Sequence, residues 1–152
     1  MHAKDKKRAL VVSGNTGVRE SVKKELIKKG FRVTLCPSPE TAEKDLRTLS
    51  VPISLVVTDL TFELITGIES KTVIAIMKGM YLVRMIHNQW GSTKTILMVS
   101  QKEYETHKNI LETCGVNACW IKSSQDAKIQ TDSLGIVVET IFRTTVAPLV
   151  DD

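Results

Sequence analysis

The segment "LVVSGNTGVRE", residues 10–20, contains the transition on which the organisation of the whole chain depends. It begins with an apolar run that predicts a buried strand. A Gly-rich turn follows at Ser13, Gly14 and Asn15, and a helical pattern starts directly after it. A turn of this kind between a strand and a helix is a common place for a bound phosphate. The loop therefore either holds a phosphate or nucleotide, or is derived from another kind of site.

The same order of strand and helix repeats along the rest of the chain. Apolar runs predict strands, and patterns of helical period separate them. The predicted strands are residues 8–12, 31–36, 53–60, 95–99 and 117–121, and the predicted helices are residues 18–29, 38–49, 80–90, 102–114 and 132–146. This alternation predicts an α/β fold with a doubly wound parallel sheet and helices on both faces. We expect a single domain over residues 1–152, with its core at about 7–146.

Residues 61–79, "TFELITGIESKTVIAIMKG", interrupt this simple alternation. The segment has a turn signal at Gly67, and an apolar run from Val73 to Met77 follows. We expect it to extend the third helix at its N-terminal end. A sheet already covered by helices has no obvious place for all of these apolar side chains, so we also expect part of an interaction surface here. The alternative is that the segment folds back and enlarges the core.

Composition excludes several classes of protein. The chain has 152 residues, of which 42% are hydrophobic and 25% are charged, and its net charge is +4. These values are typical of a soluble globular protein, and no apolar stretch reaches the roughly 18 residues of a membrane-spanning helix. The lysines are spread out and lie far from both tryptophans, which argues against a nucleic-acid surface. Three cysteines and no signal-peptide pattern favour a cytoplasmic protein that binds neither nucleic acid nor membrane.

Three polar residues follow the later predicted strands at the point where each strand ends. The third strand ends at Asp59, the fourth at Ser100 and the fifth at Lys122. In open α/β sheets, functional groups gather at the carboxyl ends of the strands. A carboxylate, a hydroxyl and an ammonium group are therefore expected at one edge of the sheet, beside the Gly-rich turn.

On these residues, the chain resembles the receiver domain of bacterial two-component response regulators. "VVTDL", "MVSQ" and "CWIKS" match the strands of that family that end in the phospho-accepting aspartate, a conserved Ser or Thr, and a conserved lysine. The resemblance covers roughly residues 7–145. It implies a flavodoxin-like five-stranded sheet in the order 2-1-3-4-5, with Asp59 as the phospho-acceptor-like position. It likewise implies that Ser100 and Lys122 occupy the switch and lysine positions.

The chain departs from the pattern of this family at the residues that would hold a metal ion. The two acidic residues that hold Mg²⁺ in receivers correspond here to Ser13 and Gly14, and Asn15 belongs to the same degenerate pocket. Further departures are Glu63 and Ser123 in place of prolines, Cys119 in place of the switch aromatic, and the insertion at 61–79. This pattern indicates a degenerate receiver, or pseudo-receiver.

Charge balance bears on metal binding. Mg²⁺ in proteins is usually held by one or two carboxylates plus waters. In an ordinary receiver it offsets an excess of acidic groups, but here Asp59 and Lys122 already balance each other. We therefore expect no cofactor, no metal site and doubtful binding of Mg²⁺.

Three functions stay open at this point. The first is a non-enzymatic signalling module that acts by protein–protein interaction without Mg²⁺-dependent phosphorylation. The second is a stand-alone response regulator that is still phosphorylated at Asp59. The third is a flavodoxin-like cofactor-binding protein, in which the turn after the first strand would hold the phosphate of FMN.

The partner in the first two readings is a protein: a histidine kinase, a phosphotransfer protein, another signalling protein, or a second copy in a homodimer. The resemblance implies a binding surface on the fourth helix, fifth strand and fifth helix. That surface includes Tyr104, His107, Lys108, Cys119 and residues near 132–143.

Overall fold

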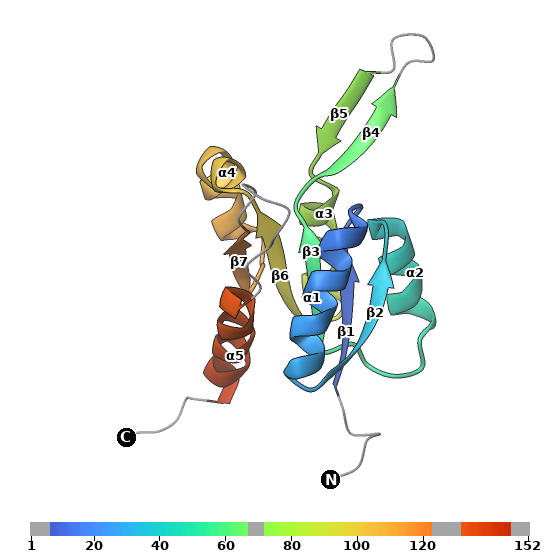
Figure 1. Cartoon of the computed structure of the whole chain (residues 1–152), viewed down its shortest axis with the longest axis vertical. Helices are drawn as coiled ribbons and strands as arrows, with labels where there is room; N and C mark the ends of the chain where they lie inside the picture. Colours follow the sequence, from blue (N-terminus) through green and yellow to red (C-terminus); the bar gives the residue numbers. More distant parts are fainter. Residues whose placement is uncertain (1–6, 67–71, 123–131, 147–152) are drawn as a thin grey trace.

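The computed structural model describes residues 7–66, 72–122 and 132–146. Strands and helices alternate around a five-stranded parallel sheet, as Figure 1 shows. The strands of this sheet are β1 (Lys7–Val12), β2 (Phe31–Cys36), β3 (Leu55–Asp59), β6 (Lys94–Val99) and β7 (Ala118–Ile121). The helices are α1 (Thr16–Lys28), α2 (Pro39–Thr48), α3 (Lys78–Gln89), α4 (Gln101–Thr113) and α5 (Asp132–Val146). The strand order β2-β1-β3-β6-β7 confirms the expected 2-1-3-4-5 order.

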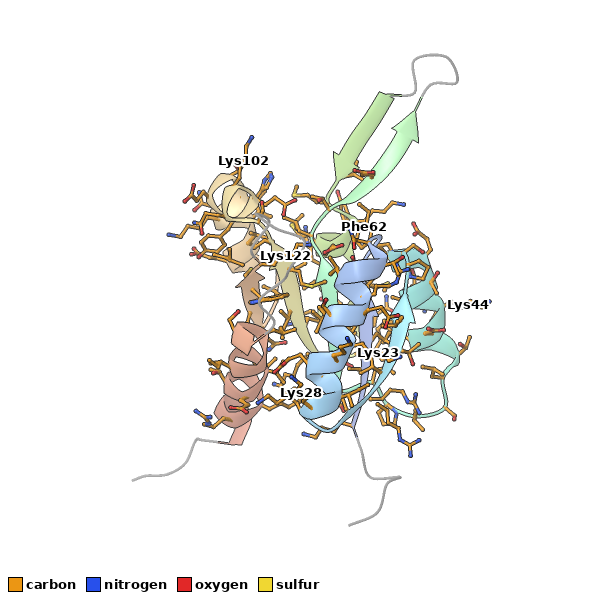
Figure 2. All side chains as sticks on the ribbon, in the orientation of Figure 1. Lys23, Lys28, Lys44, Phe62, Lys102 and Lys122 are labelled. Atoms are coloured by element: carbon orange, nitrogen blue, oxygen red, sulfur yellow. The ribbon has the colours of Figure 1, made fainter. Side chains whose placement is uncertain are left out.

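Helices cover both faces of the sheet. Successive residues of a strand point to opposite faces, so each strand supplies apolar side chains to the core on both sides. In β1, Ala9 and Val11 belong to the core cluster that packs α1 and α5, whereas Leu10 and Val12 belong to the cluster that packs α2 and α3. A third cluster packs α3 and α4 against β6. Lys28, Lys44 and Lys102 lie exposed on the outer sides of the helices (Figure 2). These lysines therefore face solvent.

The predicted extension of the third helix is wrong. Residues 62–66 and 72–76 instead pair as the antiparallel strands β4 (Phe62–Thr66) and β5 (Thr72–Ile76) of a hairpin, and α3 begins only at Lys78. The physical reason is that a short run rich in β-branched residues, "TVIAI", favours a strand. The turn signal at Gly67 lies outside the described residues.

The hairpin projects past the carboxyl end of the main sheet, which does not fit the alternative of an enlarged core (Figure 1). Its base is fixed to the body of the molecule. Phe62 is partly buried against the cluster beneath α2 and α3, and Met77 is partly buried against the cluster beneath α3 and α4. The hairpin is therefore held at its root and extends outward from there.

Helix α3 starts directly against the end of β3. The backbone N–H of Gly79 donates to the carbonyl oxygen of Leu60 at 2.9 Å. A Cβ atom at position 79 would overlap the carbonyl oxygen of Asp59. The first turn of α3 therefore requires glycine at position 79. The close approach of this glycine to the backbone of Asp59 positions that residue at the end of β3.

Candidate functional site

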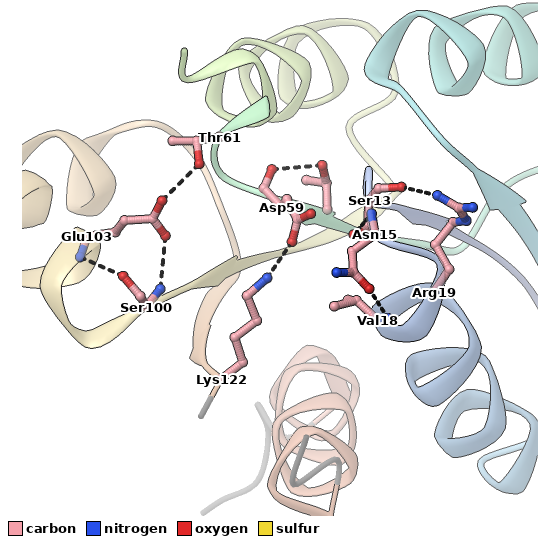
Figure 3. Close-up of polar contacts among 10 residues, drawn as sticks. Ser13, Asn15, Val18, Arg19, Asp59, Thr61, Ser100, Glu103 and Lys122 are labelled. Atoms are coloured by element: carbon pink, nitrogen blue, oxygen red, sulfur yellow. Dashed lines mark hydrogen bonds and ion pairs between the residues drawn. The ribbon is translucent and has the colours of Figure 1, made fainter. Parts of the chain in front are cut away.

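Asp59 and Lys122 form an ion pair at the carboxyl end of the sheet (Figure 3). The Lys122 Nζ donates to Asp59 Oδ1 at 2.8 Å, and the Asp59 side chain is only 13% exposed. The backbone N–H of Lys122 donates to the Val99 carbonyl at 2.9 Å, which continues the ladder between β6 and β7 and directs the residue to the strand end. The two side chains that the sequence places at the ends of separate strands thus meet, and each neutralises the other.

A pocket of about 540 Å³ opens beside this ion pair. Its lining comes from the ends of the strands, the start of α2 and the base of the hairpin: Gly14, Asn15, Pro37, Ser38, Pro39, Glu40, Asp59, Thr61, Phe62, Glu63 and Lys78. A second ion pair, Lys78 to Glu40 at 2.7 Å, lies among these residues and is more exposed. The hydrogen bond from Lys78 lowers the pKa of the Glu40 carboxyl. Glu63, at the position where receivers carry proline, is part of the same wall.

The Gly-rich turn after β1 uses its polar groups to begin α1. The buried Ser13 accepts a hydrogen bond on Oγ from the backbone N–H of Asn15 at 3.1 Å. Asn15 Oδ1 accepts from the backbone N–H of Val18 at 3.0 Å and so caps the helix. The Arg19 guanidinium donates to the Ser13 carbonyl at 2.6 Å and to the Thr16 hydroxyl at 3.1 Å. These contacts make the turn a helix cap whose side chains are engaged locally, and Figure 3 shows those among Ser13, Asn15, Val18 and Arg19.

Gly14 is different from its neighbours, because it lines the pocket and stands in open space. An added Cβ atom at this position would meet no atom within 4 Å. Among the described glycines, Gly30 and Gly115 have a positive φ angle and Gly14 does not. A side chain at position 14 would therefore be accommodated, at a residue that lines the same pocket as Asp59.

The donor groups present do not fit the Mg²⁺ site that the receiver resemblance implies. Among the described residues, no three His, Cys, Asp or Glu side chains lie close enough together to hold a metal ion. Of the strand-end residues Ser13, Gly14, Asp59, Ser100 and Lys122, Asp59 alone is a carboxylate, and one of its oxygens accepts from Lys122. Mg²⁺ prefers oxygen ligands in near-octahedral geometry and would have to compete with the lysine for that carboxylate.

Ser100 begins α4 through a capping box. Its Oγ accepts from the Glu103 backbone N–H at 3.0 Å, and Glu103 Oε1 accepts from the Ser100 backbone N–H at 2.9 Å. The other carboxylate oxygen of Glu103 accepts from the Thr61 hydroxyl at 2.9 Å. The sequence analysis missed Thr61 and Glu103, although the Ser-x-x-Glu signature of a capping box is readable at residues 100–103. The contact between them joins the loop after β3 to α4.

The surface implied for a partner comprises α4, β7 and α5, and its pocket lies on α4 and β7. A shallow pocket of about 360 Å³ is lined there by Tyr104, Leu111, Glu112, Val116, Cys119 and Ile121. Ile121 is 40% exposed at the rim of this pocket. Cys119 is half-buried, and this burial raises its pKa to about 11. The helix α4 also departs from helical geometry at His107.

No helix in the part of the chain that the structure describes is both long and apolar enough to cross a membrane. The cysteines Cys36, Cys114 and Cys119 are free thiols. Burial raises the pKa of Cys36 to about 12. Thiols with such pKa values stay protonated near neutral pH and are poor nucleophiles.

No protein-family model and no curated protein matches this chain. Most of the similar solved structures are response regulators or their receiver domains. A response regulator from Thermotoga maritima, solved with Mg²⁺ and BeF, is 24% identical with a TM-score of 0.63, and the match covers 89% of this chain and 98% of that one. The signal receiver domain of an HD domain-containing protein from Pseudomonas fluorescens is 13% identical with a TM-score of 0.67, covering 93% and 98%.

A chain described as an adenylate cyclase, from Rhodopirellula baltica, is similar to the same degree. It is 17% identical with a TM-score of 0.66, and the match covers 93% of this chain and 91% of that one. Identities this low establish the architecture and not the activity. Across nearly its whole length, the chain has the fold of response regulator receiver domains.

Proposed function

We propose that this chain is a cytoplasmic, non-enzymatic signalling module of receiver type that acts through a protein partner without Mg²⁺-dependent phosphorylation. The observation that carries the proposal is the Asp59–Lys122 ion pair beside a β1 turn that contributes no carboxylate. Phosphoryl transfer is catalysed mainly by positive charge around the moving group. In this pocket the lysine is already engaged with the acceptor, and the residues that would recruit a compensating metal are Ser13 and Gly14.

The energy scale supports the ion pair as the resting state of the pocket. Two unit charges about 4 Å apart attract by roughly 4 kcal/mol at an effective dielectric constant of about 20, before desolvation is subtracted. Both side chains are largely shielded, Asp59 at 13% and Lys122 at 22% exposure, so solvent screening is limited. A cation that recruits Asp59 must compete with this lysine for the carboxylate.

One observation favours the alternative, a response regulator that is phosphorylated at Asp59. The carboxylate lines the open pocket, and the residues at the ends of β6 and β7 are of the types found in receivers. Treatment with acetyl phosphate or beryllofluoride, with and without Mg²⁺, separates the two functions by intact mass and amide NMR. We expect neither a Mg²⁺-dependent mass increase nor a beryllofluoride-induced shift. A stoichiometric modification that disappears in Asp59→Asn would establish the alternative.

The cofactor-binding function has a direct readout of its own. Flavin bound at the turn after β1 would colour the purified protein yellow and give an absorbance band in the visible range. The turn is occupied by its own hydrogen bonds between Ser13, Asn15 and Arg19, so we expect a colourless protein.

For the partner surface, we propose the α4–β7 face, on which Ile121 and Cys119 border the shallow pocket. Ile121→Asp should abolish capture of the partner and leave the melting temperature nearly unchanged, because Ile121 is already exposed. Ile27→Asp is the matched control, since Ile27 is 50% exposed on α1. Asp59→Asn should retain the partner if phosphorylation is not required. Loss of the partner in Asp59→Asn at unchanged folding would point to the phosphorylated alternative.

A further inference from the structure

We infer that β5 of the hairpin pairs with β5 of a second copy of this chain, so that two hairpins form one four-stranded antiparallel sheet around a two-fold axis. The inference goes beyond the proposed function, because it concerns assembly and is independent of phosphorylation and of the α4–β7 face. It rests on the backbone pairing of the hairpin and on the sequence of its two strands.

Each strand of the hairpin has one edge that no other described strand pairs with. Strands β4 and β5 form a two-stranded sheet that is separate from the five-stranded one, and within the described residues each pairs only with the other. Every second residue of such a strand directs its backbone N–H and C=O away from its neighbour, where a further strand can bind. An isolated two-stranded hairpin is at best marginally stable in water. Addition of strands from a second copy would therefore stabilise it.

The two edges differ in charge. Strand β4, "FELIT", contains Glu63, whereas β5, "TVIAI", contains no charged residue and is mostly β-branched. Natural proteins protect free sheet edges with charged residues, and an uncharged apolar edge strand is a template for another chain. The charge on β4 protects that edge, and the edge of β5 is left suited to pairing.

The sequence of β5 suits pairing with itself. An antiparallel two-fold register centred on Ile74 places Ile74 opposite its own copy, Val73 opposite Ala75, and Thr72 opposite Ile76. No like charges meet in this register. The outer strands of the resulting sheet are the two copies of β4, each with Glu63, so the assembly closes at two chains and does not extend into a fibre.

The position of the hairpin separates its strands from the main sheet. Figure 1 shows it extending beyond the five-stranded sheet, to which neither of its strands belongs. Its root does not move freely, because Phe62, labelled in Figure 2, and Met77 pack against the core. The edge of β5 is therefore presented by a fixed base.

A charge-pairing experiment tests the inference by sedimentation. Wild type should sediment as a dimer. Ile74→Lys and Ile74→Glu should each weaken dimerisation at least about tenfold, which is 1.4 kcal/mol, because each places like charges opposite one another. An equimolar mixture of the two variants should recover the dimer. Leu64→Lys is the matched control, since Leu64 pairs with Ile74 across the same hairpin but lies on the outer strand, and it should stay dimeric.

Oxidation of Ile74→Cys provides a second measurement that does not depend on weakened binding. In the proposed register, Cys at position 74 faces its own copy and should form an intermolecular disulfide, whereas Leu64→Cys should not. Wild type that stays monomeric up to about 1 mM overturns the inference. So does a wild-type dimer whose Ile74→Lys and Ile74→Glu variants remain dimeric and whose Ile74→Cys variant fails to cross-link, because the dimer then uses another surface.

Discussion

The two sides of the strand-end pocket are built from different chemistry. On the side of β3 and β7, a carboxylate and an ammonium group face each other, Asp59 and Lys122 at 2.8 Å. On the side of β1, Ser13 and Asn15 are neutral and cap a helix, and Gly14 adds no side chain. The difference teaches that a receiver fold can keep the aspartate at the end of β3 without acidic residues after β1, because one lysine suffices to neutralise one aspartate.

The largest effect on stability should come from the contact between Gly79 and the end of β3. Gly79→Ala inserts a methyl group into the carbonyl of Asp59 and should cost stability at or above the upper end of the roughly 1–3 kcal/mol typical of overpacking. Gly14→Ala on the opposite side of the pocket meets no atom and should stay within about 0.5 kcal/mol of wild type. Urea denaturation measures both. Similar losses in the two variants would remove the contrast between the sides.

A double-mutant cycle measures how strongly the charged side is coupled. Asp59→Asn and Lys122→Met should show an interaction of about 1–2 kcal/mol, because both groups are largely shielded. The exposed pair on the pocket rim provides the comparison, and Glu40→Gln with Lys78→Met should show no more than about 0.5 kcal/mol. Equal coupling in the two cycles would mean that the inner pair is as weak as a surface pair.

The hydroxyl at the end of β6 should behave as a helix cap. Ser100→Ala removes the acceptor for the Glu103 N–H and should cost about 1 kcal/mol, whereas Ser100→Asn, which also caps helices well, should cost less. Thermal and urea denaturation of the two variants decide this. A Ser100→Ala variant as stable as wild type would contradict the capping role of the hydroxyl.

The smallest effect concerns pH at the rim of the pocket. Lys78 lowers the pKa of Glu40 in the folded state, so the stabilisation is present above the ordinary value of 4.5 and is lost as pH falls through the lowered pKa. Glu40 is mostly exposed, which limits the contribution to no more than about 0.5 kcal/mol. The difference in urea midpoint between wild type and Lys78→Met should therefore be small at about pH 6 and should shrink further as the pH falls toward about 3. A difference in urea midpoint that grows toward acid pH would contradict the lowered pKa of Glu40.

The sheet and the charged side of the pocket were predictable from the sequence. Parallel strands are buried on both faces and so appear as continuous apolar runs, and the residue that follows each run lies at the same edge. The meeting of Asp59 with Lys122 follows from those two facts and from opposite charge. The helix cap at Ser100 is also readable from the Ser-x-x-Glu signature at residues 100–103, and the structure shows that contact.

The hairpin and the root of α3 were not predictable in the same way. Both alternate sets of residues in β4 and β5 contain apolar members, such as Leu64 and Ile65, so the alternation that distinguishes a half-buried strand is missing. The need for glycine at position 79 arises from the close approach of a helix to a distant strand end. The Thr61–Glu103 contact is likewise tertiary and joins residues 42 positions apart.

The most direct test of the account is a Mg²⁺ titration of the wild-type protein, followed at the backbone amides of the β1 turn and of Asp59. We predict no saturable site. Any dissociation constant for Mg²⁺ should exceed about 1 mM, which corresponds to a binding free energy weaker than about 4 kcal/mol. Gly14→Asp is the internal positive control, because the position is open and a carboxylate there should restore binding at the same amides. Saturable binding to wild type with a dissociation constant below about 1 mM would contradict the claim that Lys122 alone balances Asp59.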